Sequence, residues 1–417
     1  MNLWIGIVFA IGYLAIIFES KIRVNKTASA LLMAVVCWMF DFFQKQAHLA
    51  EEIGLLGSHL NDVSQIIFFL LGAMALVELI DSHQGFRIVT DLIQTNSKRK
   101  LLWILGFATF FLSAVLDNLT TTIVVVSLLR KLVPDHKDRL LLGSMAVIAA
   151  NAGGAWTPIG DVTTTMLWIQ GNITTLAVMR SLFVPSIVCL VASLICLSFQ
   201  MSGTISHLTQ KAHEAQTAPG GRIVFFCGIG GLIFVPIFKA LTGMPPFMGM
   251  LIALGALWLI TDLMHHDHED RQHLRVPHIL TRIDTSGVLF FLGILLCIGA
   301  LESAGMLESL AHMLNEKVSN LSAIAVIVGI VSAVVDNVPL VAAGMGMYPL
   351  SMIPTDAPFW LLLAYCAGTG GSMLIIGSAA GVAFMGMEKV DFLWYLHKIA
   401  WIAAVGYFAG VGAYFLI

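Results

Sequence analysis

The sequence predicts an all-α polytopic membrane protein built from two inverted-topology repeats. Of 417 residues, 58% are hydrophobic and only 11% are charged, whereas soluble domains carry roughly 25% charged residues. The apolar residues fall in separate runs, each long enough to cross the ~30 Å hydrocarbon core of a bilayer as a helix. In each half of the chain, a short polar motif interrupts one apolar block at a matching place.

Ten apolar runs are candidate membrane spans, at about 3–18, 27–43, 62–80, 140–169, 181–199, 223–240, 246–262, 285–301, 358–387 and 391–416. Two longer blocks, 101–133 and 321–353, are each interrupted near the centre by an Asp-Asn pair. Each block could form two full spans or one re-entrant hairpin with a polar tip. Apolar length does not separate these two structures, because both return the chain to its starting side.

A polar linker at 206–222 divides the chain into a first repeat, 1–205, and a second repeat, 223–417. Each repeat contains five spans and one interrupted block. Because five is odd, the second repeat must insert upside down relative to the first. Lysine and arginine concentrate in the loops of one side, which the positive-inside rule places in the cytoplasm, with both termini outside.

Glycine motifs recur at corresponding places in the two repeats. Gly153-Gly154 precedes Ile-Gly-Asp at 159–161, and Gly370-Gly371 precedes Ile-Gly-Ser at 376–378. A glycine pair alone can mark a close helix crossing. Pro158, however, lacks a backbone donor, and glycine costs roughly 1 kcal/mol relative to alanine in a helix. We therefore expect one unwound span per repeat, at 140–169 and 358–387, with carbonyl oxygens free to bind a hard cation.

A carboxylate at membrane depth costs about 2.5–3.5 kcal/mol on insertion scales, so it marks a functional site by default. The alternative role is to cap a helix at a hairpin tip, which is compatible with ion binding. The first repeat carries two such carboxylates and is expected to hold the stronger site. The residues expected to bind a cation and protons are Asp117, Asn118, Asn151, Thr157, Asp161, Thr163, Thr164, Ser332, Asp336, Asn337, Ser372 and Ser378.

We expect Na⁺ at Asp117 and Asp161 in the first half and at Asp336 and Asn337 in the second. Burial and a neighbouring carboxylate both favour the protonated form, so Na⁺ and H⁺ compete for the same oxygens. Glu78, deep in the third span, is either a proton relay or half of an ion pair. The histidine-rich loop within 264–278 contains groups that titrate near neutral pH, and a solvated loop is its simplest interpretation.

Several classes of protein are disfavoured. The chain has no H-E-x-x-H or G-x-S-x-G motif, so no catalytic residue, enzyme activity or cofactor is expected, and nothing indicates a nucleic-acid partner. Six cysteines lie inside apolar runs and read as unpaired hydrophobes. An anion carrier is the main alternative: the acidic motifs, with no lysine or arginine close in sequence, disfavour a carboxylate substrate, whereas neutral arsenite is harder to exclude.

At these motifs the chain resembles the NhaD-type sodium/proton antiporters of the ion transporter superfamily, which also contains arsenite and dicarboxylate carriers. The resemblance covers almost the whole chain and rests on 117–122, 151–165, Asp336-Asn337, 370–372 and 377–378. Dicarboxylate carriers of the superfamily have a hydroxyl-Asn-Thr tip, so the aspartates at these tips argue against an anion.

The resemblance implies that 101–133 and 321–353 are re-entrant hairpins, one entering from each side. It also implies a homodimer with a scaffold and a moving, elevator-type transport domain in a bacterial-type inner membrane. The transported ions would be Na⁺ or Li⁺ in exchange for H⁺. The residues matching the family pattern are Asp117, Asn151, Asp161, Thr163, Thr164, Ser332 and Asn337.

Overall fold

The computed structural model describes residues 3–45, 49–86, 95, 97–204, 220–266, 269–318 and 320–417. Within these residues every regular element is helical, apart from one isolated β-bridge between Ser97 and Thr204. The predicted all-α class is therefore confirmed. Most of the predicted linker, 206–219, lies outside the described residues, as do residues 267 and 268 of the histidine-rich loop.

Among the described residues, six helices are long and apolar enough to cross a membrane, or up to eight spans exist if two bent helix pairs each count as one. The protein is a multi-pass membrane protein. The six are α3 (Lys26–Gln44), α4 (Leu49–Ser82), α10 (Thr175–Ser198), α11 (Gly221–Thr242), α12 (Pro246–His265) and α14 (Thr285–Ser303). The bent pairs are α15 (Met306–Lys317) with α16 (Leu321–Val331), and α20 (Phe392–Lys398) with α21 (Ala400–Leu416).

The interrupted blocks and the glycine-rich spans are broken where the motifs lie. Block 101–133 forms α6 (Lys98–Ser113) and α7 (Asn118–Leu132), and block 321–353 forms α16 and α17 (Asn337–Met347). Span 140–169 forms α8 (His136–Ala155) and α9 (Val162–Ile169), and span 358–387 forms α18 (Pro358–Gly370) and α19 (Ala379–Glu388). At ~1.5 Å per residue, α6 is about 24 Å long and falls short of the hydrocarbon core.

The remaining helices are short: α1 (Leu3–Ile17), α2 (Glu19–Ile22) and α13 (Val276–Ile279), with 3₁₀ turns at Glu269–Leu274 and Leu280–Arg282. In the loop predicted to be solvated, His265 ends α12 and is buried. Its Nε2 lies 3.0 Å from Nε2 of His83, so at least this histidine belongs to a helix contact.

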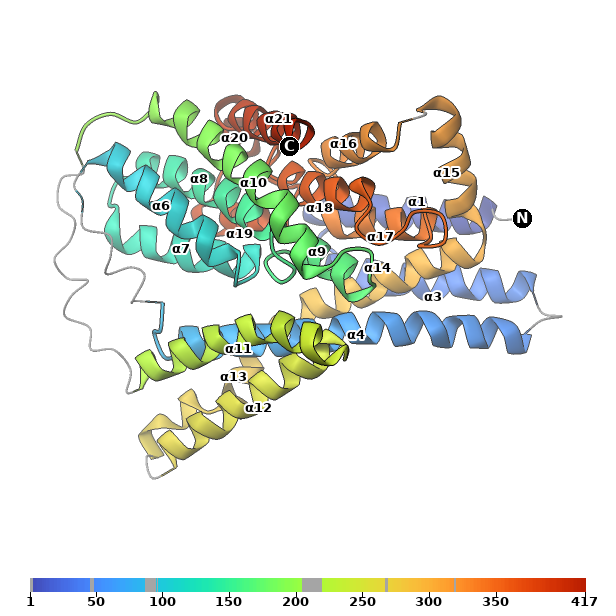
Figure 1. Ribbon diagram of the computed structural model, residues 1–417, viewed down its shortest axis with the longest axis horizontal. Helices are drawn as coiled ribbons and strands as arrows, with labels where there is room; N and C mark the ends of the chain where they lie inside the picture. Colours follow the sequence, from blue (N-terminus) through green and yellow to red (C-terminus); the bar gives the residue numbers. More distant parts are fainter. Residues whose placement is uncertain are drawn as a thin grey trace.

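The helices pack in two groups, and each group takes elements from both halves of the chain (Figure 1). The α4 group consists of α1, α3, α4, α11, α12 and α14. The α8 group consists of α6, α7, α8, α9, α10, α16, α17, α18, α19, α20 and α21. The groups meet where α14 packs on α17 and α4 packs on α9. The division into inverted repeats at the linker stays a prediction.

A polar cluster holds one end of the α4 group together. The Lys45 ammonium lies 3.3 Å from a carboxylate oxygen of Asp41 and 3.2 Å from one of Glu52, both buried, and donates to the Ser303 carbonyl at 2.9 Å. This cluster joins α3, α4 and α14. The helix α4 also exceeds the predicted span at 62–80, since its 34 residues extend over about 51 Å.

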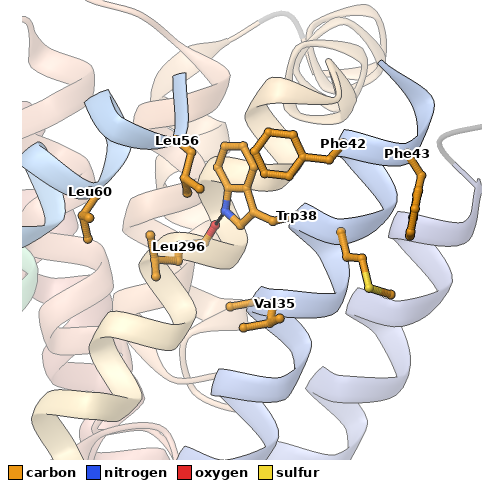
Figure 2. A pocket seen from close by; sticks show the side chains of 9 residues that line it. Val35, Trp38, Phe42, Phe43, Leu56, Leu60 and Leu296 are labelled. Atoms are coloured by element: carbon orange, nitrogen blue, oxygen red, sulfur yellow. Dashed lines mark hydrogen bonds between the residues drawn. The ribbon is translucent and has the colours of Figure 1, made fainter. Parts of the chain in front are cut away.

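A large apolar groove of about 800 Å³ lies on the same group, between α3, α4 and α14 (Figure 2). Its lining is aliphatic and aromatic, and the Trp38 indole N–H that faces it already donates to the Leu296 carbonyl at 2.8 Å. Because the lining offers no carboxylate or hydroxyl oxygen, this groove is not a cation site.

The α8 group depends on backbone contacts that only glycine permits. A Cβ on Gly153 would overlap the carbonyl of Phe110, and a Cβ on Gly370 would overlap that of Gly329. The same serine contact accompanies both crossings: Ser113 donates to the Ala150 carbonyl at 2.7 Å, and Ser332 donates to the Ala367 carbonyl at 2.9 Å. Each interrupted block is thereby pressed onto the broken helix of its own half.

Gly370→Ala is expected to lower the melting temperature of the purified protein, because overpacking a close crossing typically costs about 1–3 kcal/mol. Gly386→Ala, in α19, is the matched control, since nothing lies within 4 Å of a Cβ built there. The control should match or slightly exceed the native protein, given the better helix propensity of alanine. Equal melting temperatures for the two variants would contradict the crossing.

Candidate cation site

The helix breaks create four capped helix N-termini within the α8 group. Asp117 caps α7, Asp161 caps α9, Asp336 caps α17 and Ser378 caps α19, each side chain accepting from a backbone N–H of the first turn. Asp117, Asp161 and Ser378 adopt extended backbone conformations, and each irregular segment ends at its cap residue. The caps therefore place three carboxylates and a hydroxyl at the ends of broken elements.

Asp161 lies at the centre of this cluster and is only 1% exposed. One carboxylate oxygen accepts from the Thr163 amide at 2.9 Å and from the Thr163 hydroxyl at 2.7 Å. The other oxygen accepts from Nδ2 of Asn118 at 2.8 Å. All these donors are neutral, and no basic side chain of the described residues is within ion-pair distance of Asp161.

Two asparagines connect Asp161 to the second half of the chain. Nδ2 of Asn118 also donates to Oδ1 of Asn151 at 2.9 Å. Nδ2 of Asn151 in turn donates to the hydroxyls of Ser372 at 2.8 Å and Ser378 at 3.0 Å. The helix pair α6–α7, the broken helix α8–α9 and the segment between α18 and α19 thus share one buried network of polar atoms.

Asp117 is half-buried and accepts from the amide of Thr120 at 2.8 Å and from its hydroxyl at 2.6 Å. It lines a small cavity of about 70 Å³ between the two helix groups, enough for about two water molecules. Asn118 lies on the same cavity, and the exposed Asp284 stands at its edge, on α14 of the other group. The cavity is therefore lined by residues of both helix groups, including an exposed acid.

Asp336 has a basic partner. One of its oxygens is 4.0 Å from the Lys26 ammonium, and the side chains of Lys26 and Asp336 are 31% and 20% exposed. The ammonium also lies 4.4 Å from the centre of the Phe290 ring. Lys26 begins α3 in the α4 group, so this ion pair crosses between the groups.

The other expected residues lie around the network without bonding to Asp161. The Thr157 hydroxyl donates to the Ala114 carbonyl at 2.6 Å, and the Thr164 hydroxyl is 3.5 Å from the Ala155 carbonyl. The Ser332 hydroxyl is bonded to backbone, and Asn337 is buried at the start of α17. Glu78 lies on α4, where one of its carboxylate oxygens is 3.9 Å from the Arg282 guanidinium and accepts from the Ser82 hydroxyl at 3.4 Å.

Sequence reasoning missed three neighbours of the site: Lys26, Asp284 and Gly368. Gly368 packs against the Asp161 carboxylate, since a Cβ built on this glycine would stand 3.4 Å from one of the carboxylate oxygens. Lys26 and Asp284 lie far from the motifs in sequence, at the ends of other helices. Only tertiary packing brings them close, and no local pattern marks them.

Comparison with known proteins shows which transporters the chain is similar to. Residues 13–368 match a family model described as citrate transporter (CitMHS). The chain is 54% identical to sodium/proton antiporter 1 of Arabidopsis thaliana, over 99% of this chain and 72% of that protein. It is 52% identical to sodium/proton antiporter 2 of the same plant, over 99% of both chains. Identity to the Na(+)/H(+) antiporter NhaD of Vibrio parahaemolyticus is 30%, over 92% of this chain and 98% of that one.

Two adjacent threonines offer a matched test of the site. Thr163→Val removes a hydroxyl that donates to the Asp161 carboxylate, and a hydrogen bond to a charged group contributes about 1.5–3 kcal/mol. We expect Na⁺ binding, measured by calorimetry or by Na⁺-dependent thermal stabilisation, to weaken about tenfold. Thr164→Val removes an equally buried hydroxyl that does not contact Asp161 and should bind Na⁺ normally. Equal effects of both changes would refute the assignment.

Proposed function

Since this chain belongs to the NhaD-type sodium/proton antiporters, we propose that it exchanges Na⁺ for H⁺ across a membrane through the network around Asp161. The observation that carries the proposal is a buried carboxylate surrounded by neutral donors. A buried charge without a partner is costly, so the site gains free energy when it takes up either a cation or a proton. The two ions therefore compete for the same group.

The Asn118 amide has a specific place in this exchange. Its nitrogen lies between an oxygen of Asp161 and the oxygen of Asn151, which is the position that a bound cation would occupy. A cation that takes this position displaces the N–H donor, so the Asn118 side chain must move aside and can then turn its amide oxygen toward the ion. Hard cations prefer carboxylate, carbonyl and hydroxyl oxygens. Asn118 can thus satisfy the two acceptors in one form and bind Na⁺ in the other.

Movement of the α8 group relative to the α4 group provides alternating access. The whole oxygen network belongs to the α8 group, and the cavity at Asp117 lies along its contact with α4 and α14. In this elevator-type scheme the hairpins α6–α7 and α16–α17 are re-entrant and enter from opposite sides, as expected of inverted repeats. A site that is neutral when loaded or protonated moves through the bilayer at lower cost than a charged one.

A citrate substrate, as the family description would allow, fits this centre poorly. Citrate carries several carboxylates and needs basic partners, whereas Asp117 and Asp161 have no such partner among the described residues. Lys26 is already paired with Asp336. Arsenite is neutral and remains the alternative substrate; growth with arsenite compared with growth in high NaCl or LiCl discriminates between the two.

Asp161→Asn and Asp117→Asn are expected to abolish Na⁺-driven proton flux in reconstituted vesicles, measured with an internal pH-sensitive dye. The amide removes the charge and the exchangeable proton but keeps the shape of the side chain. Asp391→Asn is the control, because Asp391 is an exposed cap of α20 that makes the same type of contact. If the Asp161 variant transports at the native rate while the control also does, the proposed coupling is wrong.

We also assign Lys26 as the fixed counter-ion of Asp336, which leaves Asp117 and Asp161 as the exchangeable acids. Lys26→Gln adds one uncompensated negative charge near the centre and should therefore lower the apparent Michaelis constant for Na⁺ about fivefold. The double variant Lys26→Gln/Asp336→Asn should return to the native value. Lys100→Gln, an exposed lysine on α6, serves as the control. Additive effects of the two changes would show that the pair does not interact.

Three further expectations belong to this proposal. Li⁺ is transported as well, since it is a small hard cation that the same oxygens accept. The protein forms a homodimer in which the α4 group is the static part. Both termini lie outside a bacterial-type inner membrane, and the lysine-rich and arginine-rich loops lie in the cytoplasm.

A further inference from the structure

A basic groove on the α8 group lies apart from the cation site. It has a volume of about 510 Å³ and lies between the first turns of α8, the end of α10 and the bent pair α20–α21. Its lining consists of Lys137, Leu140, Leu141, Gln200, Trp394, His397, Lys398 and Trp401. We propose that this groove binds the phosphate headgroup of an anionic phospholipid.

The charges of the groove are available for an anion. Lys137 and Lys398 are exposed and form no ion pair with the described residues. The neighbouring acids are already engaged: Asp138 lies 2.6 Å from the Lys98 ammonium, Asp135 caps α8 and Asp391 caps α20. The ring nitrogen Nδ1 of His397 contacts the Leu393 carbonyl, which leaves Nε2 as the other polar atom.

The shape and position of the groove favour a lipid over a free anion. Trp394, His397 and Lys398 share one face of α20, and Trp401 continues that face on α21. Tryptophan concentrates at the level of lipid headgroups, and basic pockets between membrane helices bind anionic headgroups. Leu140 and Leu141 add an apolar wall for an acyl chain, and Leu393 and Leu396 are exposed beside it. The 51° bend between α20 and α21 is the geometry of a helix turning from the interface into the bilayer.

Two helices that line the groove also contact the network around Asp161. Tyr395 on α20 is buried and donates to the Ser372 carbonyl at 2.9 Å, while the Ser372 hydroxyl accepts from Asn151. α8 forms one wall of the groove and carries Asn151 near its other end. A headgroup that bridges Lys137 and Lys398 therefore ties together the two helices that support this network.

The test measures the melting temperature of the purified protein in nanodiscs of phosphatidylcholine, with and without phosphatidylglycerol. We expect phosphatidylglycerol to raise it by a few degrees, since a ligand that binds only the native state stabilises it. Lys137→Gln/Lys398→Gln should lose this shift. Lys100→Gln/Lys389→Gln, which removes two exposed lysines outside the groove, should keep it.

A third arm adds inorganic phosphate to phosphatidylcholine nanodiscs and should produce no shift. Three results would overturn the proposal: no stabilisation by phosphatidylglycerol, equal stabilisation of both double variants, or a phosphate shift as large as that of the lipid. The readout is independent of ion transport, so it stands or falls separately from the antiport function.

Discussion

The carboxylate of Asp161 accepts three hydrogen bonds from Thr163 and Asn118 in a buried centre, and none of these donors carries a charge. The charged form of this carboxylate is costly to bury, because neutral donors compensate only part of the lost hydration. The surrounding helices keep this carboxylate buried. Broken helices supply the irregular backbone, the asparagines link the carboxylate to the second half of the chain, and a small cavity lies beside Asp117 and Asn118.

Close backbone contacts make this centre possible. Gly153 lies against the Phe110 carbonyl and Gly370 against the Gly329 carbonyl, with a serine bond beside each crossing. Side chains at these points would push the hairpins away from α8 and α18 and open the network between Asn118, Asn151 and Ser372. Both halves of the chain contain this glycine crossing, but their helix caps differ. Asp161 in the first half corresponds in the motif to Ser378 in the second half. This difference leaves a single buried cap carboxylate in the network.

The motifs allowed much of this to be predicted. The Asp-Asn interruptions and the glycine pairs mark the helix breaks, because proline and paired glycines disfavour a continuous helix locally. Local sequence also suggests the caps at the two tips, Asp117 and Asp336, whereas the cap at Asp161 is seen only in the structure. Local sequence does not reveal which partner each side chain meets, because partners come from distant segments. The structure is therefore needed to show that Lys26 pairs with Asp336 and that Asp284 lines the cavity. It is also needed to show the full length of α4.

That length has a mechanical consequence. At about 51 Å, α4 is roughly 20 Å longer than the hydrocarbon thickness it has to cross. Its first turns, with Glu51 and Glu52, are too polar for the lipid tails, and the Lys45 cluster clamps them to α3 and α14. The position of α4 along the bilayer normal is thus set by its polar end and its apolar middle. In the elevator-type scheme proposed above, the α8 group would move past a helix whose own position in the bilayer is fixed at both its polar end and its apolar middle.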